Sequence, residues 1–207
     1  MSTALSARFL LLSHLGRAVS LAGVRNSATS ASSMLLRVTT TTDTDEGEKA
    51  LRASINSLAG QEVTNERIKS FYWWEGKVQS DEERRLSFTV DKRPFSEVCA
   101  KVGSAHNYDV PMIIADSGEE TPYWKGELAA AQGGAQLAES LAASRLVACA
   151  QVAPDGALAV KTTAKAKEAV GKLAPSISWT PILGNVPYLE WLDAETREAA
   201  AKACEQT

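Results

Sequence analysis

Residues 34–116 alternate between stretches with the hydrophobic period of a strand and stretches with that of a helix. Side chains repeat every two residues in a strand and every 3.6 in a helix, so the pattern gives an element order. That order is strand, helix, strand, strand, helix, strand. It predicts an α+β fold with an antiparallel sheet and two helices on one face, the ferredoxin-like split β-α-β sandwich.

The helices in this part are defined by their apolar residues. Leu51, Ile55 and Leu58 recur at helical spacing after an acidic opening, and acidic residues suit a helix N-terminus. Charged residues at 79–83 predict a turn between two strands. The expected elements are a strand at 34–42, a helix at 43–58, an extended stretch at 62–78, a strand at 84–92, a helix at 94–107 and a strand at 109–116.

The rest of the chain predicts a second, less complete copy of the same arrangement. Its first clear element is an alanine-rich helix, and no opening strand is evident after the boundary region at 117–133. An aromatic hairpin is also missing from this copy. The expected elements are a helix at 133–144, strands at 145–152 and 156–164, a helix at 165–175, a strand at 176–183 and a helix at 186–207.

The first segment of the chain differs in composition from the rest. Residues 1–33 contain Arg8, Arg17 and Arg25, many Ser and Ala residues, and no Asp or Glu. This pattern is typical of a mitochondrial transit segment, with a plastid transit segment as the alternative. An ordinary disordered tail is a further interpretation. We therefore keep this segment apart from the predicted fold.

Charge, hydropathy and known motifs narrow the function. The net charge of −3 gives no electrostatic case for a nucleic-acid partner. No apolar stretch approaches the roughly 18 residues of a membrane span. The sequence contains no glycine-rich phosphate loop, no Ser-His-Asp candidate set and no His-Glu-x-x-His motif. We therefore expect a protein that is not an enzyme.

An aromatic run occurs in a polar part of the chain. The sequence FYWWEGKV at 71–78 places four aromatic residues in succession between two charged stretches. Side chains alternate across a strand, so two of these rings face each side. Either both sides of the strand are covered, or one side is presented to another chain. Aromatic side chains bury about 150–250 Å² each, so this group can dominate an interface.

Several segments resemble the CutA family of divalent-cation-tolerance proteins. They are FYWWEGKV, LSFTV, SAHNYDVPMIIA and PYWKGEL, with Asn107 and Asp109 where the family usually has Pro and Glu. Further segments, AESLAASRLVACAQV, LAVKTTAKAKEAVGKL and PYLEWL, resemble the family again. The resemblance thus implies two CutA-like units in tandem. The first covers 34–128, and the second, degenerate and without the hairpin, covers 129–207.

The resemblance also implies an oligomer. Members of the family form trimers in which sheets from neighbouring subunits meet edge to edge. For this chain the implied partners are two further copies, or the other subunits of a larger protein complex. The alternative is an intramolecular partner, with the hairpin of the first unit covering the second. The expected interface residues are Tyr72, Trp73, Trp74, Tyr108, Tyr188 and Trp191.

A divalent metal, copper in particular, is a further implication of the resemblance. The candidate ligands are His106 and Cys149, because copper prefers imidazole and thiolate donors. Alternatively, His106 ends the helix at 94–107, where its charge would suit the helix dipole. At the hairpin tip, Glu75 and Lys77 are candidates for binding a small anion, with a solvated tip as the alternative.

These residues and the resemblance together imply a non-catalytic oligomeric protein that binds copper or another divalent cation and acts in metal tolerance. The first alternative is a structural or accessory subunit of a mitochondrial protein assembly. The second alternative is a sensor of a small anion, like the PII signalling proteins.

Overall fold

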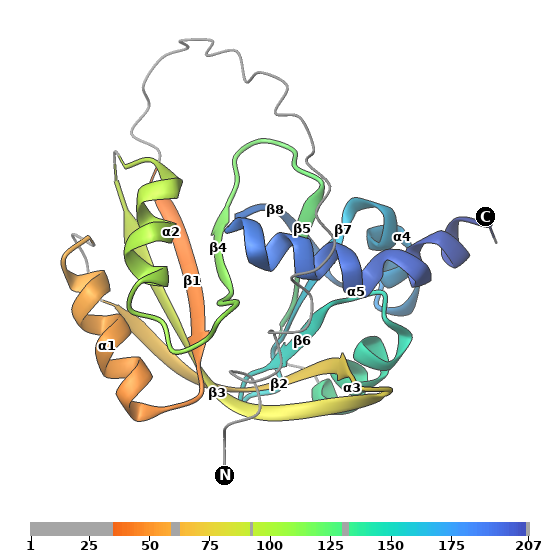
Figure 1. The fold of residues 1–207 in the computed structure, drawn as a ribbon. Helices are drawn as coiled ribbons and strands as arrows, with labels where there is room; N and C mark the ends of the chain where they lie inside the picture. The colour runs from red at the N-terminus through yellow and green to blue at the C-terminus, as the bar shows by residue number, and fades with distance from the viewer. Residues whose placement is uncertain (1–34, 59–62, 92, 130–132, 206–207) are drawn as a thin grey trace.

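The strands of the chain close into a barrel (Figure 1). The structure is a computed structural model that describes residues 35–58, 63–91, 93–129 and 133–205. Eight strands follow the order β1-β3-β2-β6-β7-β5-β8-β4, and β4 pairs with β1 to complete the ring. Every neighbouring pair is antiparallel. No helix in the described residues is long and apolar enough to cross a membrane.

The elements have the following bounds. The strands are β1 (Leu36–Thr42), β2 (Thr64–Trp74), β3 (Lys77–Val90), β4 (Ile113–Asp116), β5 (Tyr123–Leu128), β6 (Cys149–Val152), β7 (Leu158–Thr163) and β8 (Ser178–Gly184). The helices are α1 (Asp45–Asn56), α2 (Phe95–Gly103), α3 (Gly134–Ser144), α4 (Ala164–Leu173) and α5 (Val186–Glu205).

The order of elements occurs twice along the chain. The first half, 36–116, runs β1-α1-β2-β3-α2-β4, as the sequence predicts, and the second half, 123–184, runs β5-α3-β6-β7-α4-β8. The α+β class is confirmed, and the strands of the first half lie in the antiparallel order β4-β1-β3-β2, but the two sheets are not separate sandwiches. The outer strands of the first half, β2 and β4, pair with β6 and β8 of the second half. Because both outer edges are paired in this way, the two sheets become one barrel.

Strand β5 belongs to the second half of the barrel. The sequence pattern places PYWKGEL at the end of the first unit, within 34–128, and predicts no opening strand for the second. In the structure β5 pairs with β7 and β8, and it precedes α3. It could not extend the first half at β4, because β8 already pairs with that strand. The expectation of a missing opening strand is therefore wrong.

The β2–β3 hairpin turns earlier than the sequence predicts. Trp74 pairs with Lys77, so the loop consists of Glu75 and Gly76, which both have positive φ, 49° and 80°. Glycine adopts such a φ at little cost, and two-residue hairpin loops require it. The stretch 79–83, expected as a turn, lies inside β3. Asp81 and Glu83 suit a strand here because Tyr72 and Ser70 donate hydrogen bonds to them, whereas Glu82 points to the exposed side.

Three apolar clusters hold the helices on the barrel. Leu51 of α1 and Val98 of α2 pack on β1 and β3. Leu141 of α3 and Val170 of α4 pack on β6 and β7. Tyr188 and Leu192, on α5, pack against Met112, Ile114, Ala148 and Ile182. Helices α1 and α2 thus cover strands of the first half, and α4 covers strands of the second. Helix α3 contacts β2 and β3 as well as β6 and β7, and α5 contacts both halves.

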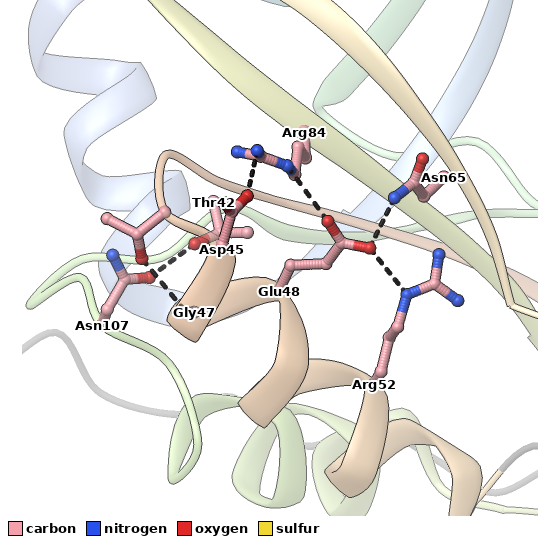
Figure 2. A network of polar contacts seen from close by, with 9 residues as sticks. Thr42, Asp45, Gly47, Glu48, Arg52, Asn65, Arg84 and Asn107 are labelled. Carbon is pink, nitrogen blue, oxygen red and sulfur yellow. Dashed lines mark hydrogen bonds and ion pairs between the residues drawn. The ribbon is translucent and has the colours of Figure 1, made fainter.

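A polar network anchors the start of α1 to the hairpin (Figure 2). Glu48 accepts a hydrogen bond from Arg52 Nε at 2.7 Å and forms an ion pair with Arg84 Nε at 3.0 Å. Arg84 also binds Asp45, and Asn65 donates to Glu48. The hydrogen bond from Arg52 is the main cause that lowers the pKa of Glu48. Because every member is bonded within the network, we interpret it as a structural contact.

Gly47 lies beside this network and is enclosed by Thr42, Thr44 and Asn107. Adding a methyl group there should therefore destabilise the protein. An alanine Cβ at Gly47 would clash with Thr42 Oγ1 and lie 2.9 Å from Thr44 Oγ1, the cap of α1. Overpacking costs about 1–3 kcal/mol, against a helix-propensity gain of at most about 1 kcal/mol. We expect Gly47→Ala to lower the free energy of unfolding in urea.

The matched control is Gly171→Ala in α4, where nothing lies within 4 Å of the added Cβ. That variant should gain up to about 1 kcal/mol from helix propensity alone. Equal effects of the two substitutions would show that Gly47 is not enclosed in solution.

Candidate functional site

One end of the barrel contains an apolar cavity of about 60 Å³. Its wall is formed by the rings of Tyr72, Trp74, Tyr108, Tyr188 and Trp191. These residues come from β2, from the segment after α2, and from α5. Five of the six predicted interface aromatics therefore meet around one cavity inside a single chain. That space is enough for a few water molecules or a small ion.

The alternation of β2 explains how the aromatic run is used. Tyr72 and Trp74 line the cavity, whereas Phe71 is 6% exposed and belongs to the cluster under α3 and α4. Trp73 shares the outer side with Phe71 by alternation and is half-buried. Phe71 pairs with Ala150 and Tyr72 with Cys149, both on β6. The hairpin of the first half thus packs on the second half of the same chain.

A chain of hydrogen bonds crosses the barrel below the aromatic wall. Tyr108 Oη donates to one carboxylate oxygen of Glu83 at 2.9 Å, and Ser70 Oγ donates to the other. Gln151 Nε2 donates to Ser70 Oγ at 3.4 Å, and Lys161 Nζ donates to Gln151 Oε1. The network joins β3 to β7 through β2 and β6.

Burial controls the charges in this network. It raises the pKa of the Glu83 carboxyl, and it raises the pKa of the Cys149 thiol to about 12. It lowers the pKa of the Lys161 ammonium to about 8. Burial also raises the pKa of Tyr108, with the Glu83 charge as the second cause. Each shift favours the neutral form of the group, as expected where little water is present.

Glu83, Ser70, Gln151 and Lys161 are missing from the sequence-based site. For Lys161 a signal exists, because it directly follows three apolar residues in the strand LAVKTT. For Glu83 the sequence gives no such signal, since it lies within a charged run that resembles solvated surface. Its burial depends on the closure of the barrel.

His106 is bound by backbone groups on both ring nitrogens. Its Nε2 lies 2.9 Å from the carbonyl oxygen of Thr41, and its Nδ1 accepts from the backbone N–H of Tyr108 at 3.0 Å. This pairing assigns the proton to Nε2. Burial lowers the pKa of His106 to about 4, so the ring is neutral near pH 7. The alternative of a charged ring ending the helix is therefore wrong, and α2 ends at Gly103.

Cys149, the other expected metal ligand, lies on the wall of the cavity. It interacts with the Ser70 hydroxyl, which also donates to Glu83. His106 is not among the residues that line this cavity. In the described parts of the chain, no three or more His, Cys, Asp or Glu residues are grouped so as to hold a metal ion. A metal at His106 would have to displace one of its two hydrogen bonds.

The remaining predicted residues lie apart from the cavity or complete its wall. Glu75 and Lys77 are exposed at the tip of the β2–β3 hairpin. Tyr188 is 4% exposed, and its ring centroid lies 5.6 Å from that of Trp191. The Tyr188 hydroxyl has no hydrogen-bond partner among the described residues. Among the aromatics expected at an interface, Trp73 alone does not line the cavity.

Comparison with known proteins gives matches in the first part of the chain. Residues 35–125 match the family model described as CutA1 divalent ion tolerance protein. The rice protein named "Protein CutA 1, chloroplastic" is 36% identical over an alignment of 105 residues. The match covers 45% of this chain and 59% of the rice protein. The chain thus spans less than two thirds of that relative. The "Divalent-cation tolerance protein CutA" of Pyrococcus horikoshii is 28% identical over 39% of this chain and 79% of its own length.

Solved structures also match part of the chain. The crystal structure of CutA1 from Oryza sativa is 36% identical, covers 41% of this chain and 83% of its own chain, and has a TM-score of 0.37. The periplasmic divalent cation tolerance protein CutA from Archaeoglobus fulgidus is 30% identical. The match covers 42% of this chain and 87% of the Archaeoglobus chain, with a TM-score of 0.37. The family match ends within β5, so α3 to α5 lie beyond it.

Proposed function

Because residues 35–125 of this chain belong to the CutA1 family of divalent ion tolerance proteins, we propose that the protein binds a divalent cation without catalysing a reaction. The cation is its cargo, and binding serves metal tolerance. Copper is the first candidate, and zinc or cadmium would use the same donors. The observation that carries the proposal is the pairing of Cys149 and Glu83 at one cavity wall, where both contact the Ser70 hydroxyl.

The donor set favours loose, exchangeable binding. A thiolate selects soft or borderline cations such as copper and zinc, and a carboxylate adds a charged oxygen donor. Two protein donors are fewer than the four of a structural zinc site, so water would complete the coordination. The cation competes with a proton for the sulfur, because burial raises the pKa of Cys149. His106 is not part of this donor set, because it does not line the cavity and backbone groups engage both of its ring nitrogens.

Cadmium titration tests the proposed pair of donors. Cd²⁺ bound to a thiolate gives an ultraviolet charge-transfer band that reports sulfur ligation directly. We expect the band in the wild type and its loss in Cys149→Ser. Glu83→Gln should weaken binding by at least about tenfold, because it removes the charged donor while keeping the shape.

The matched control for cadmium binding is Cys99→Ser. Cys99 lies on α2 in the cluster under the first half, and burial raises its pKa to about 11. This variant should bind Cd²⁺ like the wild type. A band that persists in Cys149→Ser and disappears in Cys99→Ser would contradict the proposed site.

The oligomeric state remains a prediction. In the family trimer implied by the resemblance, sheets meet edge to edge, but here β2 and β4 pair with β6 and β8 of the same chain. We propose that the two halves are two CutA-like units that supply each other's partner, so that the chain is a monomer or uses another surface to form a trimer. The mass in solution, measured by light scattering, distinguishes these states.

The destination in the cell is a further proposal. Residues 1–33, the expected transit segment, lie outside the described residues. The names of the rice and Arabidopsis thaliana relatives include the word chloroplastic. This supports the plastid over the mitochondrion as the destination of the transit segment. Fusion of residues 1–33 to a fluorescent protein would test it in plant cells.

A further inference from the structure

The end of the barrel away from the aromatic cavity contains a second, larger cavity of about 420 Å³. In β1 it is lined by Arg37 and Thr39, whereas Thr41 lines the aromatic cavity, so the two lie at opposite ends of the strand. The size falls within the range of about 300–1,000 Å³ that is usual for small-molecule sites. Its charged lining residues are Arg37, Glu66, Arg85, Lys125, Glu127 and Lys161.

The acidic residues of this cavity are already paired with two of its cations. Arg85 binds Glu66. Lys125 Nζ lies 2.7 Å from Asp116 and 3.4 Å from Glu127. Across the described residues, no carboxylate forms an ion pair with the two other cations of the lining, Arg37 and Lys161. The cavity therefore carries an excess of positive charge.

The burial of the Lys161 ammonium group lowers the stability of the fold. Its side chain is 1% exposed, and its ammonium group donates to the neutral amide of Gln151. Burying an ammonium group without a counterion costs several kcal/mol. Lys125, which is similarly buried at 7% exposed, has two carboxylates within 4 Å. Within the chain, Glu83 acts on Lys161 electrostatically, but it is linked to the ammonium group only through Ser70 and Gln151. A direct counterion of Lys161 would therefore come from outside the chain.

We propose that this end of the barrel binds a small oxyanion, a molecule bearing phosphate or carboxylate groups, held by Arg37 and by the charge of Lys161. Arg37 is exposed at the rim and offers a planar guanidinium, which matches both groups in a bidentate way. Lys161 lies deeper and attracts the anion inward. The site differs from the expected anion site at the hairpin tip, Glu75 and Lys77. It does not depend on the proposed cation site.

Calorimetric titration of the full chain at low salt tests the proposal with two probes, inorganic pyrophosphate and citrate. We expect at least one of them to bind with a Kd below about 1 mM. Pyrophosphate alone would assign a phosphate ligand, and citrate alone a carboxylate ligand. Arg37→Gln and Lys161→Met should each weaken binding by about tenfold or more.

The control variant is Lys77→Gln, which removes a cation of the exposed hairpin tip and should leave the affinity unchanged. If Lys161→Met does not fold, Arg37→Gln decides, because Arg37 is exposed and is in none of the core clusters. Absence of binding of both probes, or equal weakening by Lys77→Gln, would overturn the proposal. If the protein binds an oxyanion but not Cd²⁺, the proposed function is contradicted and the oxyanion site is not.

Discussion

Replacement of Phe71 by alanine is expected to lower the free energy of unfolding by about 3–5 kcal/mol. The ring is 6% exposed and lies in the cluster formed mainly by the second half, although β2 belongs to the first. Its removal leaves a cavity where the hairpin meets α3 and β6. Because the two halves share this cluster, we expect a single cooperative transition in urea with a lower midpoint, followed by circular dichroism.

The variant Trp73→Ala is the matched control for Phe71→Ala. Trp73 is the aromatic residue on the same side of β2, and it is half-buried. Its truncation should cost less than half as much, because Trp73 belongs to none of the three apolar clusters and its removal leaves no cavity inside them. If Trp73→Ala costs more than Phe71→Ala and also lowers the mass in solution, the aromatic run acts between chains, as in the interface expected from the resemblance.

The second large effect is a pH dependence that comes from His106. Its pKa is about 4 in the folded protein and about 6.5 in the unfolded chain. Above pH 6.5 the ring is neutral in both states, and its contribution to stability is fully present. As the pH falls from 6.5 to 4, the unfolded chain takes up a proton that the folded protein does not. The free energy of unfolding therefore falls by about 1.4 kcal/mol per pH unit, and by about 3 kcal/mol in all.

Comparison with His106→Gln isolates this contribution. Other groups also lose stability in acid, among them Glu48, whose pKa is lowered in the fold, but they are common to both proteins. The difference between the wild-type and variant unfolding free energies should thus shrink between pH 6.5 and 4. Urea unfolding at several pH values gives both curves. Parallel curves would mean that His106 is solvated and free to accept a proton in the native protein.

The first half was readable from the sequence because its helices and strands have clear periods. The stripe of Leu51 and Ile55 on α1, for example, is buried as its spacing predicts. The closure of the barrel was not readable, because it depends on pairing between strands distant in the chain, such as Tyr72 with Cys149. The misplaced turn follows from the same cause. Glu83 lies in a charged run that resembles surface, and it is buried only because the barrel encloses it.

The candidate site was partly readable as well. The aromatic residues and Cys149 were identified by type and by resemblance, and most of them meet at the cavity wall. The role of Glu83 could not be inferred, because a charged residue within a charged run is normally solvated. For Lys161, the apolar residues before it in the strand were the available signal. The neutral state of the His106 ring could not be inferred from the sequence either. Its hydrogen bond to the Thr41 carbonyl joins residues 65 positions apart.

The closure of two unequal halves by one chain has an evolutionary consequence. If two identical subunits formed such a barrel, symmetry would place every interior residue there twice. Here the corresponding strands β3 and β7 carry different groups, Glu83 and Lys161, linked through Ser70 and Gln151. Because both halves belong to one chain, a substitution in one half leaves the other half unchanged. The two ends of the barrel can thus carry different charges, as the proposed cation site at one end and the proposed oxyanion site at the other require.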